Sequence, residues 1–200
     1  MTQADRLLEA MAGAAARRYG GETVSELEHA LQCAELAEHA GVDEVIVLAA
    51  LLHDVGRYAV DQALIADRVD GARPSRGTEP LRGHHEVGAA LIAPWVPART
   101  AWCVGAHADA KRYLCATEPG YYDLLSRGSR RTLEMQGSAM SPAETARFSA
   151  QPWASDAIAL RRWDDGAKVV GKPTRPLAAW EHLLRRYFDG PPRLPAATSS

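Results

Sequence analysis

The stretch from Leu48 to Gly56 places five apolar residues directly before a histidine and an aspartate, His53 and Asp54. A helix that is apolar on every side is buried, so this one would carry both polar side chains into the protein interior. A buried carboxylate is costly unless a cation or hydrogen-bond donors compensate its charge. A bound metal ion would provide this compensation, and the alternative is a core histidine beside a helix end. The glycine that follows would let the backbone turn away.

Length, charge and cysteine content exclude several classes of protein. The chain has 200 residues, 46% of them hydrophobic, which suits one globular domain with a proper core. Its net charge of -2 argues against a general nucleic-acid or membrane-surface binder. No stretch approaches the roughly 18 apolar residues of a membrane span, and no signal peptide is expected. The three cysteines have no paired spacing, which favours reduced thiols and a cytoplasmic protein.

Hydrophobic periodicity predicts an all-α protein, with no repeat and no strand. Thr23 or Ser25 is the candidate N-cap of one helix, and Ser141 to Glu144 combines a capping box with proline at the first helical position. Helices are predicted over 4–19, 24–40, 43–54, 84–93, 98–116, from 142, over 155–170 and over 177–188, with an irregular segment at 120–138.

The domain organisation is expected to be simple. Residues 1–190 are predicted to form a single domain, and residues 191–200, rich in proline, alanine and serine, a disordered tail. The polar stretch at 73–77 is predicted to be a loop that is mobile or covers a site.

Histidines and carboxylates recur along the predicted helices. Histidine, carboxylate and water are ligands of hard or borderline ions such as iron and manganese, and the pattern recruits no cysteine. Each histidine alone is more typical of a core or surface residue, but their order and spacing together favour a metal site. The candidate ligands are His29, His53, Asp54, His84 or His85, His107 and an acid near the end of the chain.

This order of residues resembles the HD-domain superfamily. Its pattern is a histidine in an early helix, His-Asp after an apolar helix, His-x-Glu-x-Gly, another histidine and a distant aspartate. His84 fits the motif because it stands two residues before Glu86 and four before Gly88, and His85 remains an alternative. The resemblance implies a helical bundle with a dinuclear metal site, which in most of the superfamily supports phosphohydrolases.

A basic constellation accompanies the last two candidate ligands. Lys111 lies one helical turn after His107 on the same face, and Arg161 lies three residues before Asp164. Ser129 stands in the basic segment between them. A lysine, an arginine and a hydroxyl beside a metal would form a pocket for a doubly charged phospho-group. The alternative is that both cations are solvated.

The arrangement resembles the mixed-valent diiron oxygenases of the HD superfamily that cleave the carbon–phosphorus bond of 1-hydroxyalkylphosphonates. The resemblance runs from about Tyr19 to Lys168, and its strongest parts are His-x-x-x-Lys-Arg-Tyr-Leu, the segment ending in Gln136-Gly137, and Arg-x-x-Asp. It implies two iron ions, Fe(II) and Fe(III), with O2 as co-substrate and the aspartate of the His-Asp pair bridging the ions. The implied metal ligands are His29, His53, Asp54, His84, His107 and Asp164.

The same resemblance implies the substrate contacts. Lys111, Ser129 and Arg161 would hold the phosphonate oxygens. Tyr19 and Glu22, with two glycines between them, would form a mobile catalytic gate in which the tyrosine occupies the iron position until substrate arrives. The carboxylate of Glu22 would also pair with a cationic group on the substrate.

Arg57, a further candidate for substrate binding, departs from the family pattern. Members that act on 2-aminoethyl substrates can have a histidine at this position, directly after His-Asp-x-Gly. An arginine would repel a substrate cation unless it pairs with Glu22, Asp61 or another acid, or faces outward. The expected substrate is 1-hydroxy-2-(trimethylammonio or amino)ethylphosphonate, giving phosphate and glycine betaine or glycine, although a substrate with nothing beyond the hydroxymethyl group remains open.

Other functions stay open at this level. The main alternative is an HD-type metal-dependent phosphohydrolase that acts on a phosphomonoester or nucleotide through metal-activated water, without oxygen. An inositol-type ring cleaver would not need the lysine and arginine, and a silent regulator would lack ligands. Glu86, Asp109 and Asp165 are candidates to orient the ligand histidines. The expected partner is a small organophosphonate, with neither nucleic acid nor membrane, and the five tryptophans leave room for a homodimer contact.

Overall fold

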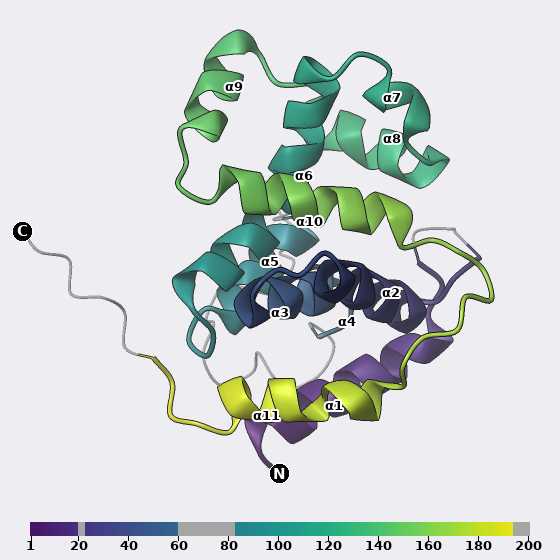
Figure 1. Ribbon diagram of the computed structural model, residues 1–200, viewed down its shortest axis with the longest axis vertical. Helices are drawn as coiled ribbons and strands as arrows, with labels where there is room; N and C mark the ends of the chain where they lie inside the picture. Colours follow the sequence, from purple (N-terminus) through teal and green to yellow (C-terminus); the bar gives the residue numbers. More distant parts are fainter. Residues whose placement is uncertain (20–22, 60–82, 194–200) are drawn as a thin grey trace, which may run out of the picture.

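The computed structural model describes residues 1–19, 23–59 and 83–193, and within these ranges the chain is helical with no strand (Figure 1). One isolated antiparallel bridge pairs Arg18 with Ser25. The all-α prediction is therefore confirmed. In the described part of the chain no helix combines the length and the apolar composition needed to cross a membrane.

The helices follow the predicted order along the chain. They are α1 (Gln3–Gly13), the 3-10 turn η1 (Ala14–Ala16), α2 (Glu26–His39), α3 (Glu44–Leu52), α4 (Val55–Tyr58), α5 (His84–Ile92), α6 (Ala98–Thr117), α7 (Tyr121–Leu124), α8 (Arg127–Met135), α9 (Pro142–Ser149), α10 (Ala154–Gly166), the 3-10 turn η2 (Leu177–Trp180) and α11 (Glu181–Phe188). The prediction of a disordered tail at 191–200 is wrong for its first residues, because Arg193 donates from its side chain to the carbonyl oxygen of Trp95 over 3.3 Å. Residues 194–200 and the polar stretch at 73–77 lie outside the described residues.

Capping residues set the starts of two helices as the sequence predicts. Ser25, rather than Thr23, caps α2, and its hydroxyl accepts a hydrogen bond from the backbone of Glu28. Ser141 and Glu144 form a reciprocal capping box on α9, with Pro142 in the first turn. Both N-caps provide hydrogen-bond acceptors for backbone N–H groups of the first helical turn that would otherwise lack partners.

The prediction of an irregular segment at 120–138 is wrong, because α7 and α8 lie within it. The hydroxyl of Ser126 caps α8. Leu133 of α8 packs with Leu114 and Tyr121 in a small apolar cluster. α8 contains only two apolar residues, Leu133 and Met135, which is too few to indicate a buried face. The packing of Leu133 against Leu114 of α6 supplies stabilisation that the isolated helix lacks.

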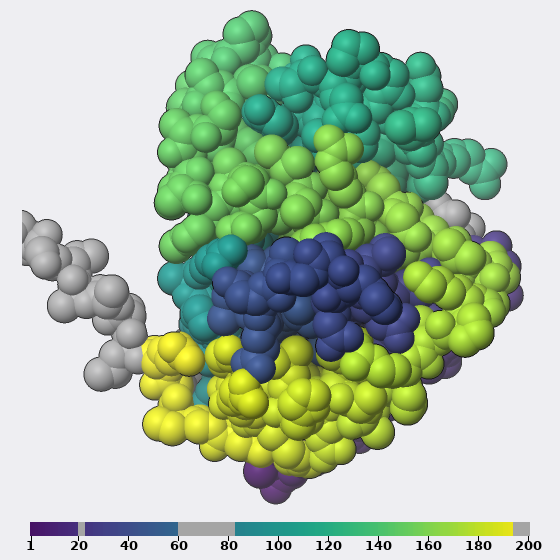
Figure 2. Space-filling model, viewed as in Figure 1, coloured from purple at the N-terminus to yellow at the C-terminus, as the bar shows by residue number. Residues whose placement is uncertain are grey.

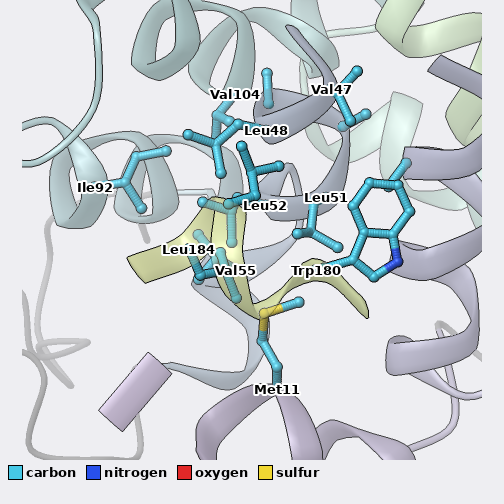
Figure 3. Packing of buried hydrophobic residues seen from close by; sticks show 14 of the residues in the cluster. Met11, Val47, Leu48, Leu51, Leu52, Val55, Ile92, Val104, Trp180 and Leu184 are labelled. Atoms are coloured by element: carbon cyan, nitrogen blue, oxygen red, sulfur yellow. The ribbon is translucent and has the colours of Figure 1, made fainter. Parts of the chain in front are cut away.

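The apolar helix α3 forms the centre of the main core, as its composition predicts. Leu48, Leu51 and Leu52 are fully buried. Figure 3 shows them among side chains from α5 and α6 on one side, and Met11 and Trp180 on the other. Because neighbours surround α3 on every side, the two residues that follow it are also carried inward.

The remaining helices form layers around this core. α1 and α11 pack together along one side of the molecule, and α10 crosses α6 and α2 on the other (Figure 1). α7, α8 and α9 lie beyond α10, and the space-filling view shows them as a mass separated from the α11 layer by α2 and α3 (Figure 2). α10 thus lies between the core and the outer helices.

Gly56 lies inside α4, where its role is a close helix contact rather than the predicted change of direction. A Cβ at this position would lie 2.0 Å from the carbonyl oxygen of His84 and 2.7 Å from the backbone nitrogen of Gly88. Gly56 of the His-Asp-x-Gly motif and Gly88 of the His-x-Glu-x-Gly motif are therefore in direct contact. This contact sets α5, and with it His84, against the His-Asp pair.

We expect Gly56→Ala to destabilise the protein by about 3 kcal/mol or more, because the added methyl group meets backbone atoms that cannot move independently. Urea unfolding followed by circular dichroism would measure this loss. Gly190→Ala is the matched control, since a Cβ there meets nothing within 4 Å, and its effect should stay within about 0.5 kcal/mol. Equal stabilities of the two variants would contradict the proposed contact.

Candidate metal centre

The His-Asp pair occupies the short break between α3 and α4. His53 is fully buried and Asp54 is 2% exposed. Burial opposes the charge of Asp54, but Arg57 and the neighbouring histidines outweigh it and hold the pKa of this carboxyl well below its usual range. The sequence therefore delivers a buried, ionised carboxylate to the centre of the bundle.

Six side chains from five parts of the chain gather at this point in two groups. Within each group the potential ligand atoms lie within 4.8 Å of one another. The first group comes from α2, the end of α3 and α10, and the second from the same helix break, α5 and α6. The groups are His29, His53 and Asp164, and Asp54, His84 and His107. These are the six residues that the resemblance implies, and His85 belongs to neither group.

Asp54 lies between the two groups and faces both. Its Oδ2 atom is 3.5 Å from Nε2 of His53 and 3.9 Å from Nε2 of His29. Its Oδ1 atom is 2.9 Å from Nε2 of His84 and 3.9 Å from Nε2 of His107. One carboxylate is thus placed to serve two ions at once.

Backbone carbonyls orient the three buried histidines. Nδ1 of His29, His53 and His107 lies 2.8 Å from the carbonyl oxygens of Ala167, Ala50 and Val104, respectively. A carbonyl oxygen only accepts, so each Nδ1 carries the proton, and each Nε2 presents a lone pair to the centre.

The expectation that Glu86, Asp109 and Asp165 orient these three histidines is wrong, because each Nδ1 is bonded to a backbone carbonyl instead. Asp109 pairs with Arg112, and Asp165 binds Arg161. The helix itself provides the acceptor for His53 and His107, because the carbonyl three residues earlier lies within reach of Nδ1.

The donor set fits two metal ions. Nε2 atoms of His29 and His53 lie 3.0 Å apart, and those of His84 and His107 lie 3.4 Å apart. Burial lowers the pKa of His53 and of His107, which favours neutral rings. Both oxygens of Asp54 are buried without a hydrogen-bond partner in the described part of the chain, although Arg57 forms an ion pair with one of them. Inward lone pairs and an unsatisfied carboxylate are the environment that cations compensate.

A cavity of about 270 Å³ opens beside the second group and is lined by Lys111, Ser129 and Arg161. Nη2 of Arg161 donates to the hydroxyl of Ser129 over 3.3 Å. Nζ of Lys111 donates to the hydroxyl of Thr132 over 2.7 Å. Both cations are buried, so the alternative that they are solvated surface charges is wrong. The structure brings together the three residues proposed to bind a phospho-group.

Sequence reasoning missed two residues that hold this cluster. Thr132 lies one helical turn after Ser129, but its segment was predicted to be irregular and so had no face to assign. The hydroxyl of Tyr121 donates to Asp165 and accepts a hydrogen bond of 3.1 Å from Nε of Arg161. Spacing carried no signal for this tyrosine, because its partners lie forty or more residues away.

Tyr19 packs directly on the first ligand group. Its ring stacks on that of His29 with centroids 3.8 Å apart, and its hydroxyl donates to Oδ1 of Asp164 over 3.2 Å. The tyrosine therefore already contacts two candidate ligands. Glu22, its proposed partner in the gate, lies outside the described residues.

Arg57 faces the cavity and pairs with an acid, so the alternative of an outward-facing side chain is wrong. Its Nε atom lies 2.9 Å from Oδ1 of Asp54. Its guanidinium carbon lies 5.1 Å from the centroid of the Tyr19 ring. Glu22 and Asp61, the other proposed partners, lie outside the described residues.

Comparison with known proteins identifies two kinds of similarity. The HD domain model matches residues 27–135. A hydroxymethylphosphonate dioxygenase of Gimesia maris is 40% identical over 152 residues, covering 75% of this chain and 71% of that protein. A [1-hydroxy-2-(trimethylamino)ethyl]phosphonate dioxygenase (glycine-betaine-forming) of Leisingera caerulea is 34% identical over 171 residues, covering 86% of this chain and 83% of that protein.

We expect Asp54→Asn to lower the metal content from two ions per chain to one or none, because an amide has no charge and only one ligand oxygen. Loading with ferrous iron under anaerobic conditions, followed by mass spectrometric metal analysis, would measure this. Asp109→Asn is the matched control, since Asp109 is half exposed and pairs with Arg112. Equal metal content in both variants would contradict the bridging role.

Proposed function

The chain belongs to the HD-domain phosphonate oxygenase family, and we propose that it cleaves the carbon–phosphorus bond of a 1-hydroxyalkylphosphonate with dioxygen. The observation that carries this proposal is the ionised carboxylate of Asp54 between two histidine groups, directly beside a buried cluster of Lys111, Ser129 and Arg161. A site with ligands for two metals and cations for one anionic group suits such a substrate.

The reaction balances without a further reductant. One 1-hydroxyalkylphosphonate and one dioxygen molecule give one carboxylic acid and one phosphate, as the bond between carbon and phosphorus breaks and C1 is oxidised. The candidate substrates differ in the group attached to C1. An aminoethyl compound would give glycine, a trimethylammonioethyl compound glycine betaine, and hydroxymethylphosphonate formate.

Two iron ions, proposed as an Fe(II)/Fe(III) pair held by His29, His53, Asp54, His84, His107 and Asp164, would supply the activation of dioxygen. The chain's own contribution is to position the substrate and to neutralise its charge.

Lys111 and Arg161 would bind the phosphonate oxygens together with the hydroxyl of Ser129. Arg161 is well placed for this role because Tyr121 and two aspartates fix its guanidinium. Nη2 of the same guanidinium also donates to the hydroxyl of Ser129. The same cavity is lined by His84, His107 and Asp164, so a ligand anchored by its phosphonate would place the adjacent hydroxylated carbon beside both ligand groups.

Tyr19 would act as the gate that the family resemblance implies. Its hydroxyl bonds to Asp164 and its ring covers His29, so substrate entry would require this contact to break. Glu22 remains a proposed member of the gate. Movement of Tyr19 would open the first ligand group only when the cavity is filled, which would protect the centre from water.

The experiment that tests the function compares phosphate release in air and under strict anaerobiosis. We expect iron-loaded protein to release phosphate from a 1-hydroxyalkylphosphonate only when oxygen is present, with one carboxylate formed per phosphate. Hydroxymethylphosphonate and the two cationic ethyl compounds would be assayed in parallel. Phosphate esters turned over in both conditions, with no phosphonate cleaved, would return the chain to the phosphohydrolases.

The affinity for substrate should depend on the protonation of Lys111. Burial, followed by repulsion from Arg161, lowers the pKa of this ammonium to about 7. As the pH rises through this value the ammonium loses its proton and its attraction for the phosphonate. We expect KM to rise by up to about tenfold per pH unit above the pKa in the wild type, but not in Lys111→Arg, whose guanidinium stays charged.

Measurements of KM between about pH 6 and 9 would compare the two proteins. The substrate's own ionisation affects both equally and cancels in their ratio. Lys172→Arg, the same substitution at a residue that does not line the cavity, should keep the wild-type profile. Parallel profiles for Lys111→Arg and the wild type would contradict the role of this ammonium.

A further inference from the structure

The cavity is strongly cationic. Three guanidinium groups line it, those of Arg57, Arg131 and Arg161, together with the titratable ammonium of Lys111. Among its described lining residues the only carboxylate is Asp164, and this group already binds Arg161 over 2.6 Å and Lys168 over 3.3 Å. No lining carboxylate in the described ranges is therefore free to pair with a cation on a ligand.

Two further guanidinium groups line the cavity besides the residues proposed to bind the phosphonate. They belong to Arg57, which lies over the Tyr19 ring, and to Arg131 of α8. Arg131 is an exposed residue whose side chain can turn into solvent. Arg57 has no such freedom, because Asp54 and the Tyr19 ring hold it in place.

The backbone also fixes Arg57. It belongs to α4, whose contact with α5 through Gly56 admits no added atom. Its carbonyl oxygen accepts a hydrogen bond of 3.0 Å from Arg17. Arginine keeps its charge at all ordinary pH values. Its partner Asp54 faces both ligand groups and would share its charge with two bound metal ions, so the ion pair does not cancel the positive charge that Arg57 presents to the cavity.

The aromatic surface of the cavity offers no place for a quaternary ammonium either. Such groups bind over the faces of Trp, Tyr or Phe, and Tyr19 is the one side chain of these types among the described lining residues. His29 stacks on its ring, and Arg57 and Lys168 lie 5.1 and 5.6 Å from its centroid. The Tyr19 ring is therefore already in contact with two cationic side chains of the protein.

We propose, resting on the function above, that Arg57 makes this site selective for 1-hydroxyalkylphosphonates without a cationic tail, of which hydroxymethylphosphonate is the simplest. A second positive charge near Arg57 would be repelled in a part-buried site where charges interact strongly. The expected preference against the amino and trimethylammonio compounds is at least about tenfold in affinity.

Binding and turnover would be measured separately. Isothermal titration calorimetry of iron-loaded protein without oxygen would give Kd for hydroxymethylphosphonate and for the two cationic ethyl compounds. Phosphate release in air would then give kcat/KM for the same three compounds. Iron content and helicity of every variant would be determined first.

Three variants test whether the charge of Arg57 causes the preference against cationic compounds. Arg57→Gln should reduce the preference to within about threefold, whereas Arg57→Lys, which keeps the charge, should retain it. Arg186→Gln is the matched loss of charge at an exposed residue that pairs with Glu44, and it should bind all three compounds as the wild type does. A purely structural role of Arg57 would weaken binding of the three compounds alike.

The outcomes separate this proposal from the function on which it rests. Cationic compounds that bind the wild type as tightly as hydroxymethylphosphonate overturn the role of Arg57 without any variant, even if all are cleaved. A preference that disappears in Arg131→Gln but persists in Arg57→Gln also overturns it. Failure of the function would look different, because no phosphonate would then release phosphate in air.

Discussion

The charge of Asp54 is the constraint on which the rest of the structure depends. An ionised carboxylate at the centre of a bundle is costly unless positive charge surrounds it. Here α3 carries the group inward, three histidines turn their Nε2 atoms toward the centre, and Arg57 lies 2.9 Å from one oxygen. The fold thus concentrates negative charge and lone pairs at one point, which is the condition for binding two cations.

α10 connects this centre to the cavity lined by Lys111, Ser129 and Arg161. Asp164 contributes to the first ligand group, and Arg161, one turn earlier on the same face, donates to Asp164 and reaches Ser129. Asp165 and Tyr121 hold the other edge of the guanidinium. A single helix therefore fixes the distance between the proposed metal site and the proposed phosphonate site, so that one molecule can occupy both.

The two ends of the proposed substrate would be bound by different helices. The residues that would bind the phosphonate lie on α6, α8 and α10, whereas Arg57 lies on α4. Under the proposed role of Arg57, a change at this one position would alter selectivity for the far end of the substrate and leave the proposed phosphonate contacts in place. The family pattern has a histidine at this position in some members, and this chain has an arginine whose charge faces Asp54 and Tyr19.

The sequence by itself determined the helical class and the buried helix before the His-Asp pair, because hydrophobic periodicity is a local property. The set of six candidate ligands came from the resemblance to a known family, which the order of histidines and carboxylates along the chain made visible. The sequence also placed Lys111 and Arg161 one turn from ligands. Only the tertiary structure decided that α8 is a helix and that Arg57 and His84 border the same cavity. These features depend on contacts between α6, α7 and α8 and between α4 and α5, and the energies of such contacts are set by residues far apart in the chain, which no local pattern records.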